Sequence, residues 1–383
     1  MVNGKERLDS YICGIAGYFV TDPSLVSNGG LWSMSRCLIT GIQSRGRDAA
    51  GYAYITPTGR TNFAKSPVEA KDFIKIPGHL LHELPKQMPT NMLLHARYAT
   101  QGEPKNNQNN HPLYSKISGL CMIHNGWFVN DGEIKEKFSL KPDAEVDTEV
   151  YLRLIEKFYI EGDIKTIETS IKEATKCVYG AIACGMIQGG KPNVMWLWRD
   201  RGDLYVVQTE WGYVFASTPS ILFNAIGCLS TFDLASLKRF YIPVSTLVKF
   251  ELGKKPKIFP LEPIEWNNHG YSGDVYTTTV NGEEKIRRVK KSNGGTTTTY
   301  YYGQYDTTPD GVSHGTYFGD YKANKGLCLP GVSGYEPAET NGGTEKAADQ
   351  TKPERPKEHH YQCRCQACIK WWRWQAETNG MIE

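Results

Sequence analysis

The residue types that could perform nucleophilic chemistry are spread over the first 150 positions of the chain. Cys13, at the head of an apolar segment, has the most nucleophilic of the ordinary side chains. Asn125 and Gly126 offer a side-chain amide and an unobstructed backbone N–H, which are donors of the kind that stabilise an oxyanion. Arg97 can bind a carboxylate through two parallel hydrogen bonds, and Asp147 can pair with an ammonium group. Taken singly, none of these residue types identifies an activity.

Each of these residues also has a simpler structural interpretation. A cysteine in an apolar strand is most often a small buried hydrophobe, and Asn-Gly is a strong hairpin signal. Asp147 suits the start of a helix, and the segment Arg45–Asp48 is typical of a polar turn before a strand. Only the order and spacing of the whole set favour the functional interpretation.

The ordered set resembles the class II glutamine amidotransferases, which are N-terminal-nucleophile hydrolases. It consists of CGI at Cys13, RGRDAAG from Arg45, HARYAT from His95, HNG from His124 and DTE from Asp147. It is most similar to the glutaminase half of glutamine–fructose-6-phosphate aminotransferase, and the resemblance covers about Cys13 to Leu252. It implies an α+β fold, a four-layer αββα sandwich of two packed antiparallel sheets.

The resemblance also implies the roles of individual residues. Glutamine would be hydrolysed to glutamate and ammonia through a γ-glutamyl thioester, with no cofactor. The α-amino group of the cysteine would act as the base, because its pKa of roughly 7.7–8.0 lies near working pH. The implied catalytic residues are Cys13, Asn125 and Gly126; the implied substrate-binding residues are Arg97, Tyr98, Thr100 and Asp147; Arg45 and Asp48 would support the surrounding loops.

Two features depart from the family pattern. Twelve residues precede Cys13, so we expect Met1–Ile12 to be a propeptide whose removal frees the amine. The alternatives are a later translation start and an unprocessed, catalytically silent relative that serves as a binding or scaffold protein. Tyr98 and Gln101 stand where the most similar relatives have Trp and His, which weakens any inference of sugar specificity. As an alternative to glutamine hydrolysis, the protein could be an N-terminal-nucleophile amidase that acts on another amide.

The pattern of apolar residues predicts the elements that would position these groups. Apolar spacing of three and four residues predicts helices over 31–42, 147–159 and 164–178. Strands are expected over 12–20, 51–55, 92–98, 120–124, 181–187, 194–198, 204–208, 213–216 and 246–250. Strands in succession after a pair of helices favour sheet-on-sheet packing over a parallel doubly wound sheet.

Composition limits the class of protein. The chain has 383 residues, 40% of them hydrophobic, and 44 Lys+Arg against 41 Asp+Glu. This near balance gives no reason to expect a nucleic-acid or membrane partner. The charged N-terminus has no signal-peptide pattern, so we expect a cytoplasmic protein without disulfides. No phosphate-binding or dinucleotide-binding glycine loop is found in the sequence.

The composition changes near Trp266. Residues 267–383 contain only 11 Leu, Ile, Val or Phe but 15 Gly and 14 Thr, so a largely irregular tail is expected. Within it, Thr296–Tyr302 has high β-propensity and could pair with a partner. The tail end combines the pair His359-His360 with Cys363, Cys365, Cys368, Trp371, Trp372 and Trp374. We expect no metal and an aromatic anchor, with a zinc knot as the alternative. No ammonia-consuming domain is recognisable, so we expect a separate acceptor protein, with release of free ammonia as the alternative.

Overall fold

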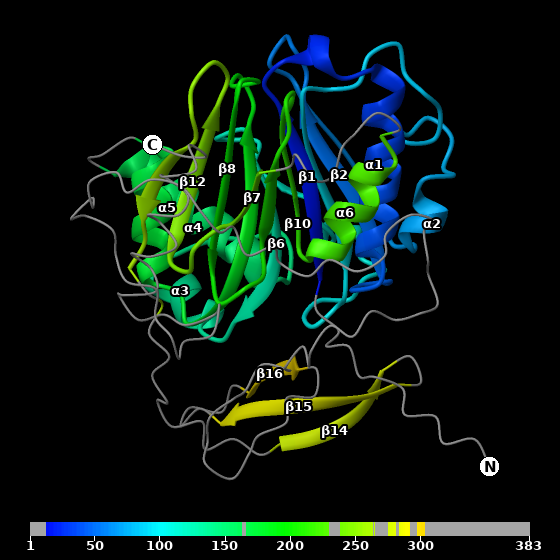
Figure 1. The fold of residues 1–383 in the computed structure, drawn as a ribbon. Coiled ribbons are helices and arrows are strands. Elements are labelled where there is room, and N and C mark those ends of the chain that lie inside the picture. Colours follow the sequence, from blue (N-terminus) through cyan, green and yellow to red (C-terminus); the bar gives the residue numbers. More distant parts are fainter. Residues whose placement is uncertain are drawn as a thin grey trace, which may run out of the picture.

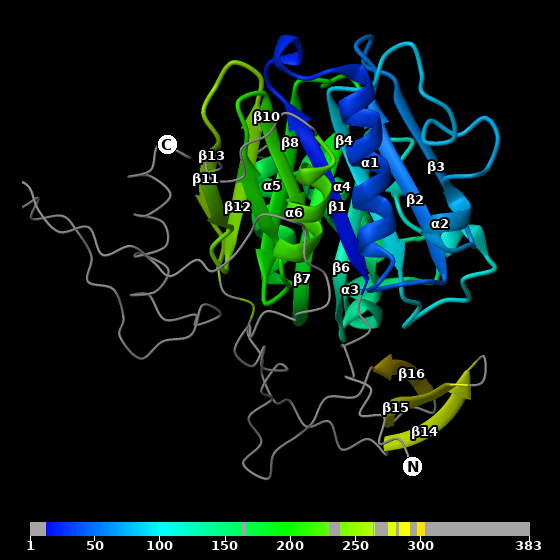
Figure 2. The same ribbon diagram turned by 45° about the vertical axis from the view of Figure 1, so that its right-hand side comes forward.

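Two antiparallel sheets packed face to face form the body of the structure (Figure 1). The computed structural model describes residues 13–162, 166–229, 238–262 and 264, and three strands between residues 275 and 302. Helices cover the outer face of each sheet, as the two ribbon views show (Figure 2). The order of layers is therefore helix, sheet, sheet, helix, and the α+β sandwich predicted from the resemblance is confirmed.

The first sheet has seven strands in the order β11-β9-β10-β1-β4-β2-β3. Its strands are β1 (Gly14–Val20), β2 (Ala49–Ile55), β3 (Thr61–Ser66), β4 (Asn91–Arg97), β9 (Tyr205–Gln208), β10 (Gly212–Ala216) and β11 (Lys238–Tyr241). Its outer face carries α1 (Asn28–Ile42), α2 (Ala70–Phe73) and α6 (Pro219–Gly227). Because β1 lies between β10 and β4, the chain enters the domain at the centre of this sheet.

The second sheet has six strands in the order β13-β12-β8-β7-β6-β5. They are β5 (Leu113–Tyr114), β6 (Leu120–Phe128), β7 (Gly180–Gln188), β8 (Val194–Asp200), β12 (Thr246–Glu251) and β13 (Lys257–Pro260). On its outer side lie α3 (Asp131–Lys137), α4 (Asp147–Glu161) and α5 (Ile167–Lys176). Single 3-10 turns occur at Pro23–Leu25 and Asn107–Asn109.

Alternating side chains separate the layers. Along β1, Tyr18 packs under the helices α1 and α6, whereas Ile15 and Phe19 point between the two sheets. Along β6, Ile123 belongs to the layer between the sheets and Met122 to the layer under α4 and α5. The period of two in strand side chains thus builds three apolar layers from two sheets.

Helix positions follow the predicted spacing. In α1 the Ser27 side chain caps the first turn by accepting from Gly30 N at 3.0 Å, and Leu31, Leu38 and Ile42 are buried. The helix predicted over 147–159 is α4, and the one predicted over 164–178 contains α5.

The expectation of a chain without disulfides is wrong. Cys37 of α1 is bonded to Cys228, the residue that caps the end of α6. The two cysteines are 191 residues apart in sequence, so nothing in their spacing indicates that α1 and α6 pack together on one sheet.

Three strands are described in the tail, where the sequence predicts a largely irregular chain. They are β14 (Val275–Val280), β15 (Glu283–Lys291) and β16 (Thr297–Tyr302), paired in that order as one antiparallel sheet. The strand expected over 296–302 is therefore β16, and its partner is β15 of the same chain. The expected propeptide and the His359–Trp374 cluster lie outside the described residues. Among the helices that the structure describes, none has the length and apolar character needed to span a membrane.

Candidate active site

Cys13 lies directly before β1, and its thiol contacts the backbone at the end of β4. The Tyr98 N–H donates to Cys13 Sγ at 3.4 Å, and the thiol donates to Tyr98 O at 3.4 Å. Arg45 Nε donates to the Cys13 carbonyl at 3.4 Å. Two segments distant in sequence, at Tyr98 and at Arg45, therefore contact the cysteine.

Burial keeps the Cys13 thiol protonated. It raises the pKa of this thiol to about 11, against smaller opposing effects of the Tyr98 backbone and the nearby Arg97 guanidinium. Among the described residues, the hydrogen bonds of the thiol go to the Tyr98 backbone and not to a histidine. A nucleophilic thiolate at this position therefore needs a proton acceptor in addition to the described side chains.

Arg97, the last residue of β4, is 2% exposed and held by neutral oxygens. Its guanidinium donates to Asn110 Oδ1 at 2.7 Å, to Gly102 O at 2.9 Å and to Gln101 O. Asn110 is fully buried and also donates to Pro104 O at 2.8 Å. The loop that follows β4 thus folds back around Arg97 and sets its orientation.

The turn before β2 supports the same strand end. Asp48 N donates to Arg97 O at 2.9 Å, and Asp48 Oδ2 accepts from Ala99 N at 2.7 Å. A Cβ at Gly46 would lie 2.3 Å from the carbonyl carbon of Arg97, so this close approach requires glycine. Arg45 and Asp48 therefore contact Cys13 and the end of β4, and the supporting role that the resemblance implies for them stays a prediction.

Asp147, the first residue of α4, is aimed at the end of β6. Its carboxylate accepts from Phe128 N at 3.1 Å and from Thr148 N at 2.6 Å. Burial is the main cause that raises the pKa of Asp147 to about 7, and the neighbouring Asp131 carboxylate adds to the shift. This carboxyl group therefore changes charge near neutral pH.

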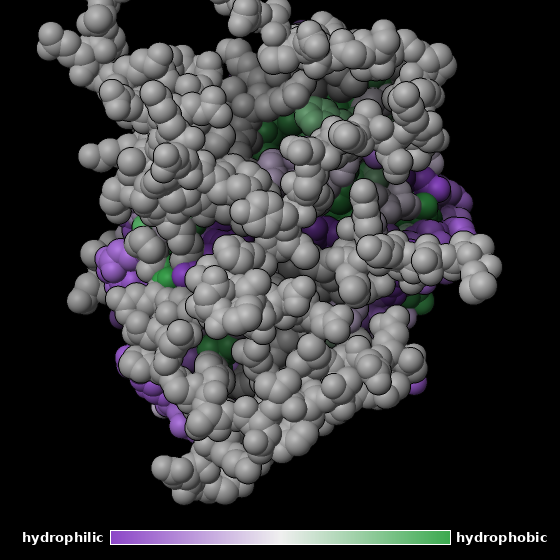
Figure 3. All heavy atoms as spheres, turned by 60° about the horizontal axis from the view of Figure 1, so that its bottom comes forward, coloured by the Kyte–Doolittle hydropathy of each residue, from purple (hydrophilic) through white to green (hydrophobic). Residues whose placement is uncertain are grey.

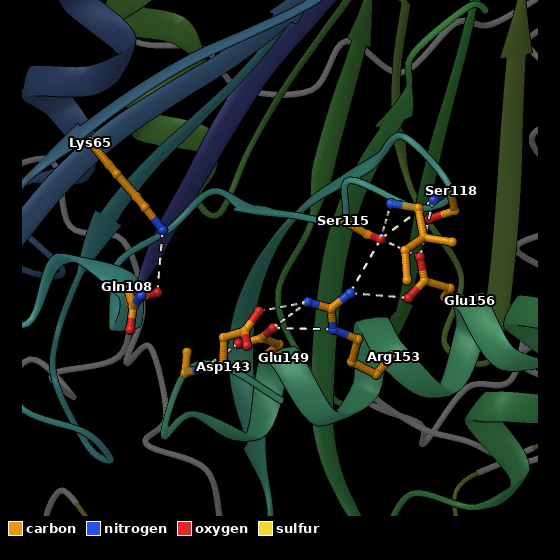
Figure 4. A network of polar contacts seen from close by, with 10 residues as sticks. Lys65, Gln108, Ser115, Ser118, Asp143, Glu149, Arg153 and Glu156 are labelled. Atoms are coloured by element: carbon orange, nitrogen blue, oxygen red, sulfur yellow. Dashed lines mark hydrogen bonds and ion pairs between the residues drawn. The ribbon is translucent and has the colours of Figure 1, made fainter. Parts of the chain in front are cut away.

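An ion-pair network anchors α4 next to this carboxylate (Figure 4). Arg153 pairs with Glu149 at 2.9 Å, with Glu156 at 3.1 Å and with Asp143 at 3.2 Å. Glu156 also accepts from Ser115 next to β5. Two of the carboxylates are more than nine-tenths buried, so the network ties the first turns of α4 to the second sheet.

Asn125 and Gly126 lie within β6, on the sheet opposite Cys13. Asn125 is 2% exposed, and its Oδ1 has no hydrogen-bond partner among the described residues. Gly126 has a φ of +150°, and a Cβ there would lie 2.0 Å from Ala181 O. Tyr98 and Thr100 are half-buried in the loop after β4. The structure thus brings Cys13, Tyr98, Arg97 and Asp147 together, whereas among the described residues no recorded contact joins Thr100, Asn125 or Gly126 to Cys13.

Three buried histidines, His95, His111 and His124, are neutral. His95 Nε2 contacts the His124 carbonyl at 3.0 Å, and the His95 ring stacks on His111 with centroids 4.2 Å apart. Burial lowers the pKa of His95 to about 3 and that of His124 to about 4. The described residues contain no group of three metal-ligating side chains with the geometry to hold a metal ion.

Sequence reasoning gave no role to three residues that organise the site: Gln101, Asn110 and Asp131. Gln101 and Asn110 follow the HARYAT motif, and no local pattern reveals that Gln101 bonds to Asp131 or Asn110 to Arg97. Asp131 lies a few residues after His124-Asn125-Gly126, at the start of a short helix, and this proximity in sequence could have marked it as a site residue.

The site lies at the end of the domain where β1 begins, the lower end in Figures 1 and 2. Figure 3 views this end, and the described residues visible there include strongly hydrophilic and hydrophobic ones side by side.

Comparison with known proteins shows similarity to glutamine amidotransferases. Residues 95–224 match the model of the glutamine amidotransferase domain. Over 223 residues the chain is 29% identical to glutamine–fructose-6-phosphate aminotransferase of Fusobacterium nucleatum. This alignment covers 55% of this chain and 32% of that protein. It is 28% identical to the same enzyme of Bacteroides thetaiotaomicron over 268 residues, covering 66% of this chain and 38% of that protein. The chain therefore spans about a third of the length of these relatives.

Solved structures show the same fold. Glutamine phosphoribosylpyrophosphate amidotransferase from B. subtilis, complexed with ADP and GMP, aligns with a TM-score of 0.50 at 19% identity. The alignment covers 65% of this chain and 49% of that one. The structure titled as the allosteric regulatory enzyme of purine biosynthesis aligns with a TM-score of 0.51 at 20% identity, with the same coverage. Residues 95–224 thus carry a glutamine amidotransferase domain, the chain is similar over about half its length to glutamine–fructose-6-phosphate aminotransferase, and the solved structures share its fold.

Proposed function

We propose that this domain hydrolyses L-glutamine to glutamate and ammonia through a thioester on Cys13. The observation that carries the proposal is the meeting of Cys13, Arg97 and Asp147 at one end of the sandwich. All three groups lie close enough for Arg97 and Asp147 to act electrostatically on the thiol. A nucleophile, a cation and an anion so arranged match the carboxamide, carboxylate and ammonium groups of glutamine.

The base in this mechanism is the α-amino group of Cys13 itself. Removal of residues 1–12 would expose that amine next to a thiol whose pKa burial raises to about 11. The amine takes the thiol proton, and the sulfur attacks the glutamine Cδ. Asn125 and Gly126 donate to the oxyanion, and the amine returns its proton to the departing ammonia. Water then hydrolyses the thioester to glutamate.

The raised thiol pKa also favours one alternative, a silent binding or scaffold protein. If residues 1–12 stay attached, the described side chains provide no base for Cys13. Intact-mass measurement and N-terminal sequencing of purified protein, paired with a glutaminase assay, separate the two. We expect a chain beginning at Cys13 that releases ammonia from glutamine, and no release from the Cys13→Ala variant. Full activity in a chain that keeps residues 1–12 would contradict the proposed base.

The ammonia acceptor in this proposal is a separate protein that binds residues 266–383. Truncation after Glu265 should leave glutamine hydrolysis near normal and remove a co-purifying acceptor enzyme. Loss of several kcal/mol of folding stability on truncation would show instead that the tail packs on the domain, because about 5–15 kcal/mol is the usual total.

A further inference from the structure

The Gln101 side chain joins the first residues of two helices. Its Nε2 donates to Asp131 Oδ2 at 3.0 Å, and its Oε1 accepts from Asp147 N at 3.0 Å. The partners fix the orientation of the amide, since a carboxylate needs the donor end and a backbone N–H needs the acceptor end. Gln101 therefore couples Asp131, at the start of α3, to Asp147, at the start of α4.

The coupled carboxylates are near enough to interact electrostatically. Asp131 is 8% exposed, and its Oδ1 has no hydrogen-bond partner in the part of the chain that the structure describes. The Asp131 charge also raises the pKa of the Asp147 carboxyl, so the two groups act on each other. Two neighbouring carboxylates shielded from water are unfavourable unless a cation joins them or one of them takes up a proton.

In the described part of the chain no cation forms an ion pair with either carboxylate, although Arg97 and Asp147 attract each other from further apart. The described ion pairs include neither Asp131 nor Asp147, and the Arg97 guanidinium is directed to the oxygens of Asn110, Gln101 and Gly102. A compact ammonium group supplied by a ligand would satisfy the free Asp131 Oδ1 and neutralise the pair.

We propose that Gln101 is a positioning residue that holds Asp131 and Asp147 together as a two-carboxylate subsite for the α-ammonium group of the substrate. This inference rests on the proposed function and adds to it. The subsite selects amides that carry a free, charged α-amino group and disfavours their deaminated or N-acylated analogues. Gln101 acts through the carboxylates and does not touch the reacting carbon.

The test exchanges the amide of Gln101 and the carboxylate of Asp131 between the two positions. Gln101→Glu keeps the acceptor for Asp147 N but replaces the donor to Asp131 with a repelling charge. Asp131→Asn removes one carboxylate. The double variant restores both features, because the amide introduced at position 131 can donate to the carboxylate introduced at position 101, and the number of negative charges returns to that of the wild type. Gln108→Glu, in the neighbouring exposed turn, is the matched control for an added charge.

Glutaminase kinetics and calorimetric binding of L-glutamine are measured for every variant, with binding on the Cys13→Ala background. Gln101→Glu should raise the glutamine KM at least tenfold with kcat within about threefold, and the double variant should recover most of that loss. Asp131→Asn alone should also weaken glutamine binding and should move the acid limb of kcat/KM to lower pH. Binding of glutaramate, which lacks the α-amino group, should change little in any variant.

The outcomes separate this inference from the proposed function. Failure of the wild type to release ammonia, with binding still sensitive to Gln101→Glu, would refute hydrolysis and leave the subsite intact. Equal effects of Gln101→Glu and Gln108→Glu, or no recovery in the double variant while thermal melting shows intact folds, would overturn the subsite. Parallel losses of glutamine and glutaramate binding would also overturn it, because they would mean a merely structural role.

Discussion

Lys65 Nζ donates to the backbone carbonyl of Asn110 at 2.6 Å, and the side chain of the same Asn110 orients Arg97. Lys65 lies on the edge strand β3 and also reaches Gln108 O at 3.3 Å (Figure 4). Burial lowers the pKa of Lys65 to about 8. A lysine of the sheet edge thus holds the loop that orients the arginine proposed to bind the substrate carboxylate.

Replacing Asn110 with Leu should weaken glutamine binding without removing the chemistry. The change leaves the buried Arg97 guanidinium without one acceptor, at a cost of about 1–3 kcal/mol. We expect a glutamine KM at least tenfold higher and a kcat within about threefold. Gln108→Ala is the control, since Lys65 contacts only its backbone. An unchanged KM in Asn110→Leu would mean that Arg97 is oriented by Gln101 O and Gly102 O alone.

Arg97 and Asn125 should give different kinetic signatures. Arg97→Lys should raise the glutamine KM strongly, because a point charge does not reproduce a two-pronged contact with a carboxylate. Asn125→Ala should lower kcat by about 10²–10³ with little change in KM, since its donor acts on the oxyanion. Steady-state kinetics of the two variants check the assignment, and identical signatures would contradict this division of roles.

Glutamine binding should weaken in acid. Asp147, whose pKa is raised to about 7, must be ionised to attract an ammonium group. Below pH 7 the glutamine KM should therefore rise about tenfold per pH unit, while the α-ammonium itself stays charged. Kinetics between pH 5.5 and 8 on the wild type and on Asp147→Asn provide the check. A KM that is constant over this range in the wild type would exclude Asp147 from ammonium binding.

The buried histidines should make folding sensitive to acid. Their folded-state pKa values lie below the unfolded value of about 6.5, so the unfolded state binds more protons. Stability is full above about pH 6.5 and falls as the pH drops toward 4, by about 1.4 kcal/mol per pH unit for each such histidine.

His111→Phe tests this sensitivity. It keeps a ring against His95 but removes one titrating group whose pKa is well below its usual range. Urea unfolding at pH 7, 5.5 and 4.5 should show a smaller acid loss in the variant. The raised pKa of Asp147 acts in the opposite direction but is present in both proteins, so the difference isolates His111. Equal pH slopes would contradict the prediction.

The sequence predicted the elements whose apolar pattern is regular and missed those whose pattern is not. The strand expected over 92–98 is β4 (Asn91–Arg97), and the helix expected from Asp147 begins at that residue. The edge strand β3 (Thr61–Ser66) is half-buried and mostly polar, so it has no alternation to detect. In the site, the sequence indicates which residue types are present but not which of them are hydrogen-bonded to one another. The bonds from Gln101 to Asp131 and from Lys65 to Asn110 depend on which loops the two sheets bring together.

The bond between Cys37 and Cys228 makes a covalent ring of the chain from α1 to the end of α6. Strands of both sheets, from β2 to β10, lie inside that ring, whereas β1 and Cys13 lie outside it. A protease that cuts an exposed turn within the ring, such as the one at Leu84, would therefore release no fragment until the bond is reduced. A domain nicked within the ring would run as a single band on a non-reducing gel, whereas one cut can detach a segment outside the ring, either the arm that bears Cys13 and β1 or the chain after Cys228.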